Sequence, residues 1–116
     1  MNAERTPLID RARGLSLLGN DAQLYAAFLS AFPAEPSFAA MLCALEAGDV
    51  QAAFLNAHSL KGLCAQLALC ALGEEASAIC ELLRGGDAKA LPEARAHAER
   101  VSELHEATCR AIRAGC

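Results

Sequence analysis

The apolar residues of this chain recur every three or four positions, and glycine or proline separates most runs from the next. The first clear run is Leu24, Tyr25, Phe28, Leu29 and Phe32, which have the spacing of one face of an α-helix. Comparable runs follow over residues 38–45, 50–69, 71–83 and 92–112. The pattern therefore predicts a series of helices.

Residues that favour helix ends mark the expected boundaries. Asn20 or Asp21 can cap the first long helix, and Asp49 can cap a helix that continues to about Leu69. Gly48 is placed to end the helix before Asp49. Further breaks are expected at Pro33 and Pro36, at the G-G-D sequence of residues 85–87 and at Gly115, while Pro92 suits the first turn of the last helix.

The N-terminal segment predicts one more short helix. Thr6 followed by Pro7 reads as a helix cap with proline at the first helical position. Gly14 can end this helix, and residues 14–19 then form a link to the next one.

Composition supports an all-α fold. The chain is 54% hydrophobic but only 4% aromatic, and alanine and leucine, which supply most of the apolar content, are strong helix formers. Short loops between the helices favour antiparallel neighbours. We expect an up-down antiparallel four-helix bundle with one or two short accessory N-terminal helices, forming a single domain over residues 1–116.

The charge pattern argues against several classes of partner. The formal net charge is -4, and the basic residues are scattered, which makes nucleic acid and anionic membranes poor candidates. No uninterrupted apolar run reaches the ~20 residues that span a bilayer. Residues 1–13 lack the apolar core of a signal peptide. We expect a cytoplasmic, monomeric protein, and Met1 favours a free-standing one.

The six cysteines predict no disulfide framework, because a secretory context is missing. No pair has the C-x-x-C spacing of many zinc sites, so we expect no metal site. We interpret most of them as small buried hydrophobes, with Cys116 exposed and the most readily oxidised. A cysteine-based redox or metal sensor stays open as an alternative. His97 and His105 are expected to be exposed residues of the last helix.

The helix over residues 49–69 has two distinct faces when projected at about 100° per residue. One face can enter the core, and its residues are Ala53, Ala57, Leu60, Cys64 and Leu67. A neighbouring stripe carries one ionisable group, His58, among uncharged residues. The other members of this stripe are Gln51, Leu55, Gly62, Ala65 and Leu69, and we expect them to form a surface on which a partner docks.

The chemistry of the stripe centres on His58. A neutral imidazole is a good nucleophile near neutral pH, since its reference pKa is about 6.5. It can attack an acyl phosphate and hold the phosphoryl group as a phosphoramidate. Lys61, three residues on, can offset the phosphoryl charge. Gly62 costs about 1 kcal/mol in a helix interior, which is explained if another protein approaches closely over the histidine.

Three segments resemble the histidine phosphotransfer (HPt) family. Residues 58–67 read H-S-L-K-G-L-C-A-Q-L, similar to the family's H-x-L-K-G signature followed by N/Q-L. Residues 18–25, L-G-N-D-A-Q-L-Y, and residues 45–49, L-E-A-G-D, resemble two weaker family marks. The chain departs from the family at Ala68, where glycine is frequent. The resemblance implies a four-helix bundle with phosphorylation at His58, Lys61 beside the phosphate and room for it at Gly62.

The predicted function is that of a phosphorelay intermediate. His58 would accept a phosphoryl group from a receiver-domain aspartate of a hybrid sensor kinase and pass it to the receiver of a response regulator. The protein would have no kinase activity and no cofactor of its own, with Mg²⁺ supplied by the receiver. The alternative is an adaptor or inhibitor that binds a receiver or kinase domain through the same helix face without being phosphorylated.

Overall fold

The computed structural model describes residues 6–115, and this part of the chain is helical without strands. The helices are α1 (Arg11–Leu17), α2 (Ala22–Ala31), α3 (Ser37–Ala47), α4 (Val50–Leu67), α5 (Cys70–Leu83) and α6 (Leu91–Ala114). Short 3-10 turns at Phe32–Ala34 and Ala88–Ala90 precede α3 and α6.

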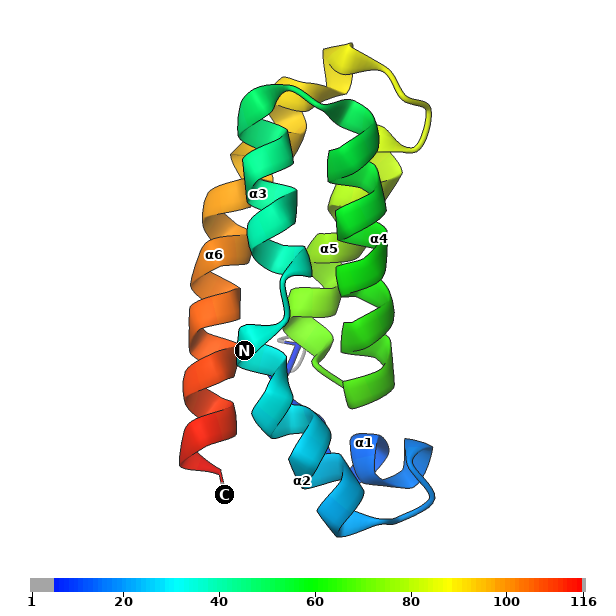
Figure 1. Ribbon diagram of the computed structural model, residues 1–116, viewed down its shortest axis with the longest axis vertical. Coiled ribbons are helices and arrows are strands. Elements are labelled where there is room, and N and C mark those ends of the chain that lie inside the picture. Colours follow the sequence, from blue (N-terminus) through cyan, green and yellow to red (C-terminus); the bar gives the residue numbers. More distant parts are fainter. Residues whose placement is uncertain (1–5, 116) are drawn as a thin grey trace.

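The four helices α3 to α6 form an antiparallel bundle (Figure 1). Each packs against the next in the chain, and α3 also meets α6 to close the ring. The connections are short, which makes consecutive helices run in opposite directions. The accessory helices α1 and α2 lie at one end of the bundle, where α2 contacts both α4 and α6. The expected four-helix bundle with N-terminal accessory helices is confirmed.

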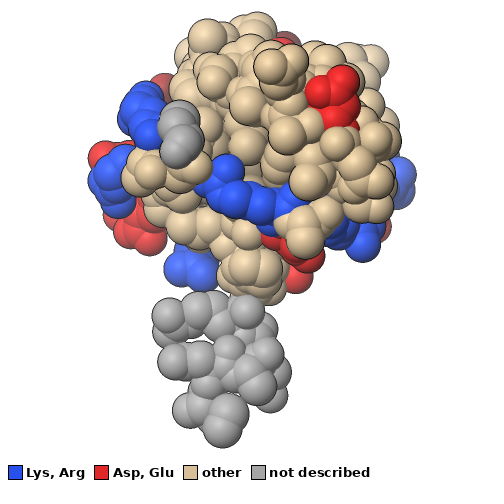
Figure 2. All heavy atoms as spheres, turned by 90° about the horizontal axis from the view of Figure 1, so that it is seen from below, with Lys and Arg blue, Asp and Glu red and all other residues tan. Residues whose placement is uncertain are grey.

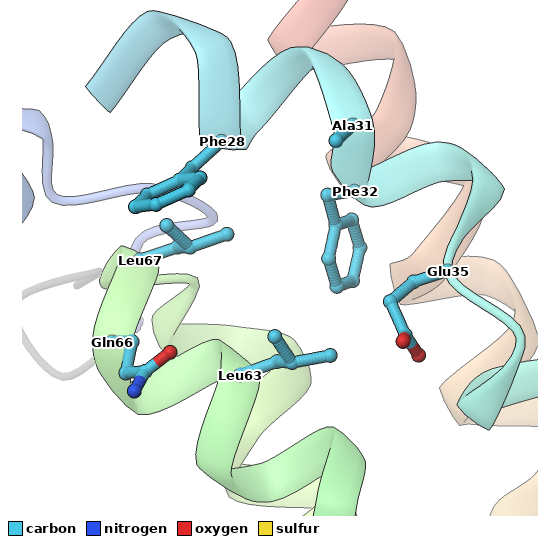
Figure 3. Close-up of a pocket in the computed structure, with 7 residues that line it drawn as sticks. All are labelled: Phe28, Ala31, Phe32, Glu35, Leu63, Gln66 and Leu67. Carbon is cyan, nitrogen blue, oxygen red and sulfur yellow. The ribbon is translucent and has the colours of Figure 1, made fainter. Parts of the chain in front are cut away.

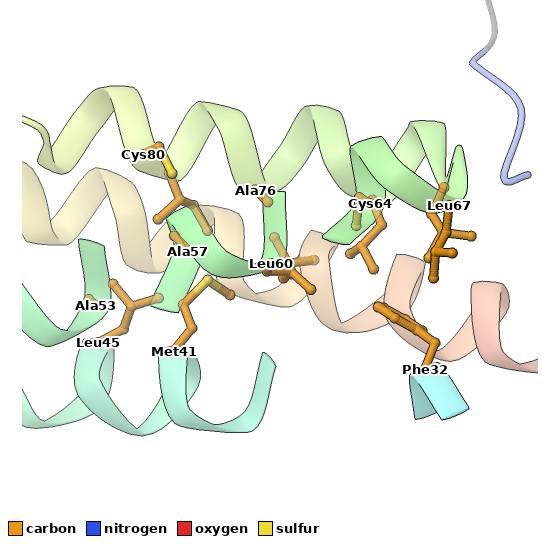
Figure 4. Packing of buried hydrophobic residues seen from close by; sticks show 14 of the residues in the cluster. Phe32, Met41, Leu45, Ala53, Ala57, Leu60, Cys64, Leu67, Ala76 and Cys80 are labelled. Carbon is orange, nitrogen blue, oxygen red and sulfur yellow. The ribbon is translucent and has the colours of Figure 1, made fainter. Parts of the chain in front are cut away.

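The core of the bundle lies along one side of α4. Ala53, Ala57, Leu60, Cys64 and Leu67, the five positions predicted to face inward, are all buried. They pack against buried residues of the neighbouring helices, among them Phe32, Met41, Leu45, Ala76 and Cys80 (Figure 4). Full burial of one large apolar side chain contributes roughly 1.5–3 kcal/mol. The packing therefore fixes the rotation of α4 and leaves its opposite side facing solvent.

The helix ends flanking α4 follow the predicted signals. The Asp49 side chain accepts a 3.1 Å hydrogen bond from the backbone N–H of Ala52, which satisfies a donor that the first turn of a helix leaves free. Gly48 ends α3 with a φ of 78°, a left-handed conformation that costs glycine little. Asp21 caps α2 through the N–H of Leu24. Gly48 and Asp49 set where α4 begins and therefore where His58 falls along it.

The N-terminal prediction was wrong in its boundaries. Asp10, not Thr6, caps the first helix, and Gly14 lies buried inside that helix rather than ending it. A Cβ atom at Gly14 would collide with the ring of Tyr25, so the glycine permits close packing of α1 on α2. The segment before Asp10 instead contacts the start of α5, where the carbonyl of Leu8 accepts a 3.1 Å hydrogen bond from the N–H of Cys70.

The stretch Ala22–Ala47 is long and apolar enough in composition to pass for a membrane-spanning helix. In the structure a 3-10 turn containing Pro33 divides it into α2 and α3. Helix α3 packs against α4 and α6. Core helices of a bundle meet the same compositional test, so this stretch by itself does not indicate a membrane protein.

Candidate functional site

His58 lies near the middle of α4 on the side opposite the core, and its side chain is exposed. Gln51, Leu55, Gly62 and Ala65 are exposed on the same side. Leu55 is the most exposed large apolar side chain of the described chain, at 55%. These four residues of the predicted stripe do share an uncharged surface with His58.

Leu69, the remaining predicted member of the stripe, does not belong to it. Its side chain is 0% exposed, because α4 ends at Leu67 and Ala68 turns the chain with a φ of 57°. The helical projection that placed Leu69 on the stripe therefore does not apply beyond that turn. Leu69 enters the core immediately before α5, so its assignment as a docking residue is wrong.

Gly62 is open to solvent. A Cβ atom placed there would meet nothing within 4 Å, which excludes close packing within the bundle as the reason for this glycine. Side chains on a helix tilt toward its N-terminus, so a larger residue at position 62 would lean over the turn that carries His58. The geometry fits the expectation that the glycine keeps space free above the histidine.

Lys61 lies at the edge of α4 that faces α5 and is partly buried. Its charge acts on two residues of α5. Burial raises the pKa of the Cys80 thiol, and Lys61 opposes that increase. The pKa of Glu81 is lowered chiefly by its hydrogen bond and charge interaction with Arg84, with a smaller contribution from Lys61. The lysine is therefore on the α5 side of His58, within the electrostatic reach of Glu81.

An aromatic residue that the sequence did not single out borders His58. The ring centroids of Phe54 and His58 are 6.0 Å apart, with the rings tilted by 43°. The guanidinium carbon of Arg84 lies 5.8 Å from the centre of the Phe54 ring. Phe54 precedes His58 by four residues, which places both on one helix face. That spacing in the sequence could have indicated Phe54, whereas only the fold shows that Arg84, at the C-terminal end of α5, approaches its ring.

A groove borders the opposite edge of the site (Figure 3). It lies between α2 with its following turn and the second half of α4, and Phe28, Ala31, Phe32, Glu35, Leu63, Gln66 and Leu67 line it. Phe28 is 46% exposed although it is a large apolar residue. The face around His58 is thus bordered by an apolar groove toward α2 and by charged residues toward α5. The contribution of α2 to this face was not predicted from the sequence.

The other two histidines are more involved in packing than the sequence suggested. His97 Nδ1 lies 2.8 Å from an Oε1 oxygen of Glu75, and both side chains are partly buried. The ring of His105 is stacked on that of Phe38, with centroids 3.9 Å apart. Burial lowers the pKa of His105. The expectation that both are simply exposed is wrong, because α6 turns them toward α5 and α3.

The cysteines do not form an evident reactive centre within residues 6–115. Cys64, Cys80 and Cys109 are buried, Cys70 is partly buried and Cys43 is exposed. Burial raises the pKa of Cys64 to about 12, which keeps it a thiol at neutral pH. The described residues contain no cluster of His, Cys, Asp and Glu suited to a metal. Cys116, expected to be exposed, lies outside the described residues.

Charges of both signs lie on the end of the molecule formed by the accessory helices. Figure 2 views the end of the molecule where α1 and α2 lie. On this face basic and acidic side chains lie near one another and uncharged residues cover much of the area. This mixed pattern agrees with the scattered basic residues of the sequence.

The fold and site together define a small helical bundle that presents a histidine from the middle of one helix on an uncharged surface. Comparison with known families identifies the chain more closely, since the family model for the Hpt domain matches residues 23–114. The chain belongs to the Hpt family. No curated protein and no solved structure gave a significant match.

Membership of the Hpt family assigns the chain a role in the phosphorelays of two-component signalling. Domains of this family carry phosphoryl groups and are not kinases, and they interact with receiver domains and kinases. The match begins after α1 and extends to the last residue of α6, so it includes all four helices of the bundle.

Proposed function

We propose that His58 is the phosphoacceptor of a phosphorelay, taking a phosphoryl group from a receiver-domain aspartate of a hybrid sensor kinase and passing it to the receiver of a response regulator. The observation that carries this proposal is the exposure of His58 in mid-helix beside the open position at Gly62. The imidazole can be reached from solvent, and a phosphoryl group on it has space.

The proposed transfer needs a nucleophile from this chain and a good leaving group from the partner. The unprotonated ring nitrogen of His58 attacks the phosphorus of the aspartyl phosphate. A P–N bond forms as the P–O bond to the aspartate breaks, and the carboxylate leaves as its anion. The second transfer reverses these bond changes, with the aspartate of the next receiver as nucleophile. The receiver supplies the Mg²⁺ that neutralises the phosphoryl oxygens.

Lys61 supplies the cation on this side of the transfer. An ammonium group on a flexible side chain can follow the phosphoryl oxygens as they approach His58. Lys61 follows His58 by three residues, and its side chain tilts back toward the turn that carries the histidine. We propose that it stabilises the phosphorylated form without taking part in bond formation.

The docking surface would consist of Gln51, Leu55, Gly62 and Ala65 around His58, extended by the groove toward α2. An exposed apolar patch of this kind is typical of a protein-binding surface. Leu55 and Phe28, at 55% and 46% exposure, would supply its apolar contacts. We propose that the protein works as a monomer, because a transient partner needs this surface free. We propose the cytoplasm as its location.

The transfer assay tests the proposal directly. A phosphorylated receiver labelled with ³²P is mixed with the protein, and the label should move to a product that is labile in acid and stable in alkali, as a phosphoramidate is. His58→Gln should abolish labelling, whereas the matched variant His97→Gln should be labelled normally. If His58→Gln binds the receiver as wild type does and wild type is never labelled by a panel of receivers, the protein is an adaptor instead.

A further inference from the structure

Arg84, the residue that follows the last turn of α5, lies between the charged residues of that helix and the ring of Phe54 beside His58. Its Nη2 lies 2.7 Å from Oε2 of Glu81, and its guanidinium lies over the ring of Phe54. Phe54 in turn contacts His58, at a centroid distance of 6.0 Å. Phe54 therefore makes ring contacts with both the guanidinium and the imidazole.

The position of Arg84 allows it to move. Its side chain is 52% exposed, and it lines an open groove with Val50, Gln51, Phe54, Leu83 and Gly86. Ion pairs at such an exposed site are weak and exchange readily with other anions. A phosphoryl group is a strong competitor, because it carries nearly two negative charges and arginine binds its oxygens through two parallel hydrogen bonds.

We propose that Arg84 is a second cation for the phosphoryl group on His58, and that Glu81 binds Arg84 while His58 is unphosphorylated. In the unphosphorylated protein Glu81 keeps the guanidinium beside Phe54. When His58 carries the phosphoryl group, Arg84 leaves Glu81 and joins Lys61 at the phosphoryl oxygens. The inference rests on the proposed phosphorylation of His58.

In this arrangement Glu81 opposes the phosphorylation of His58, whereas Arg84 favours it. Its carboxylate competes with the phosphoryl group for Arg84 and, at longer range, for Lys61. A negative charge at the α5 edge also disfavours a dianion nearby. The balance between Glu81 and Arg84 then sets how much of the protein is phosphorylated at equilibrium with a given receiver.

The test compares the equilibrium constant for transfer from a phosphorylated receiver to each variant. One unit charge near an exposed site changes such an equilibrium by roughly threefold. We expect Arg84→Gln to lower the constant about threefold and Glu81→Gln to raise it by about as much. Arg84→Lys should give an intermediate value, because it keeps the charge and loses the paired hydrogen bonds. All three differences should shrink with added salt.

The matched controls change a similar ion pair elsewhere. Arg110 and Glu106 form an exposed pair at 3.3 Å on α6, across the bundle from α4. Arg110→Gln and Glu106→Gln alter the net charge equally, and neither should change the constant. If Arg84→Gln behaves like Arg110→Gln while wild type is phosphorylated, the inference is overturned and the proposed function stands. If wild type accepts no phosphoryl group at all, both are overturned.

Discussion

The hydroxyl of Tyr25 donates a 2.8 Å hydrogen bond to the backbone carbonyl of Leu67, joining the accessory helix α2 to the last turn of α4. Tyr25 is 5% exposed, and its ring lies against Gly14 of α1. One side chain therefore connects three helices. It also links α2, which lines the groove of Figure 3, to α4, which carries His58.

Tyr25→Phe should lower the free energy of unfolding by about 1 kcal/mol, because it removes one buried hydrogen bond and leaves the packing in place. Urea denaturation followed by circular dichroism measures this change. Gly14→Ala is expected to cost more, about 1–3 kcal/mol, since its Cβ collides with the Tyr25 ring. Equal stability of Tyr25→Phe and wild type would show that the bond adds nothing to folding.

Gly62 is predicted to favour function at the expense of stability. Gly62→Ala should raise the free energy of unfolding by about 1 kcal/mol, because alanine is the better residue in an exposed helix interior. Gly62→Leu, whose side chain would lean over His58, should slow phosphoryl transfer at least about tenfold, equivalent to a barrier increase near 1.4 kcal/mol. Ala96→Leu, at an exposed position of α6, is the matched control and should transfer at the wild-type rate.

Ala68 is predicted to be a site of strain. Its φ of 57° is left-handed, a conformation that costs a residue with a Cβ atom roughly 1 kcal/mol. Ala68→Gly should therefore stabilise the protein by up to about 1 kcal/mol. The midpoint of urea denaturation would rise without a change in slope. A lower midpoint would mean that packing of the methyl group outweighs the strain.

His105 should make stability depend on pH. Burial lowers its pKa in the folded protein below the usual 6.5, so the unfolded chain binds the proton more tightly. The contribution of His105 to stability is complete above about pH 6.5 and is lost as the pH falls through the range between the unfolded and folded pKa values. His105→Phe keeps an aromatic ring against Phe38 and removes the titration.

The measurement for His105 is the free energy of unfolding of both proteins between about pH 5 and 8. The carboxylates titrate in wild type and in the variant alike, so their effect cancels in the difference. The variant should gain stability relative to wild type as the pH falls. A difference that is constant over this range would contradict the role assigned to His105.

The sequence was sufficient for the parts of the fold that depend on local pattern. The buried face of α4 followed from its helical period, and the boundary between α3 and α4 followed from Gly48 and Asp49. Leu69 was misplaced because periodicity does not reveal that Ala68 leaves the helix with a positive φ. Gly14 was misread because only the position of Tyr25 distinguishes a helix end from a close contact.

The candidate site was predictable to the extent that it lies on one helix. His58, Lys61 and Gly62 are close in sequence, and their spacing alone indicated a shared function. Phe28 belongs to α2 and Arg84 directly follows α5, so only the packing of these helices on α4 brings the two residues to the edges of the site. Long-range neighbours of this kind leave no local pattern in a single sequence.

Transfer of label from a phosphorylated receiver to wild type and to His58→Gln tests the central claim most directly. Both proteins are mixed with the same labelled receiver, and circular dichroism verifies that the variant is folded, as expected for a change at an exposed position. The account predicts acid-labile, alkali-stable label on wild type and none on His58→Gln. Full labelling of His58→Gln would contradict it, because the phosphoryl group would then reside on another residue.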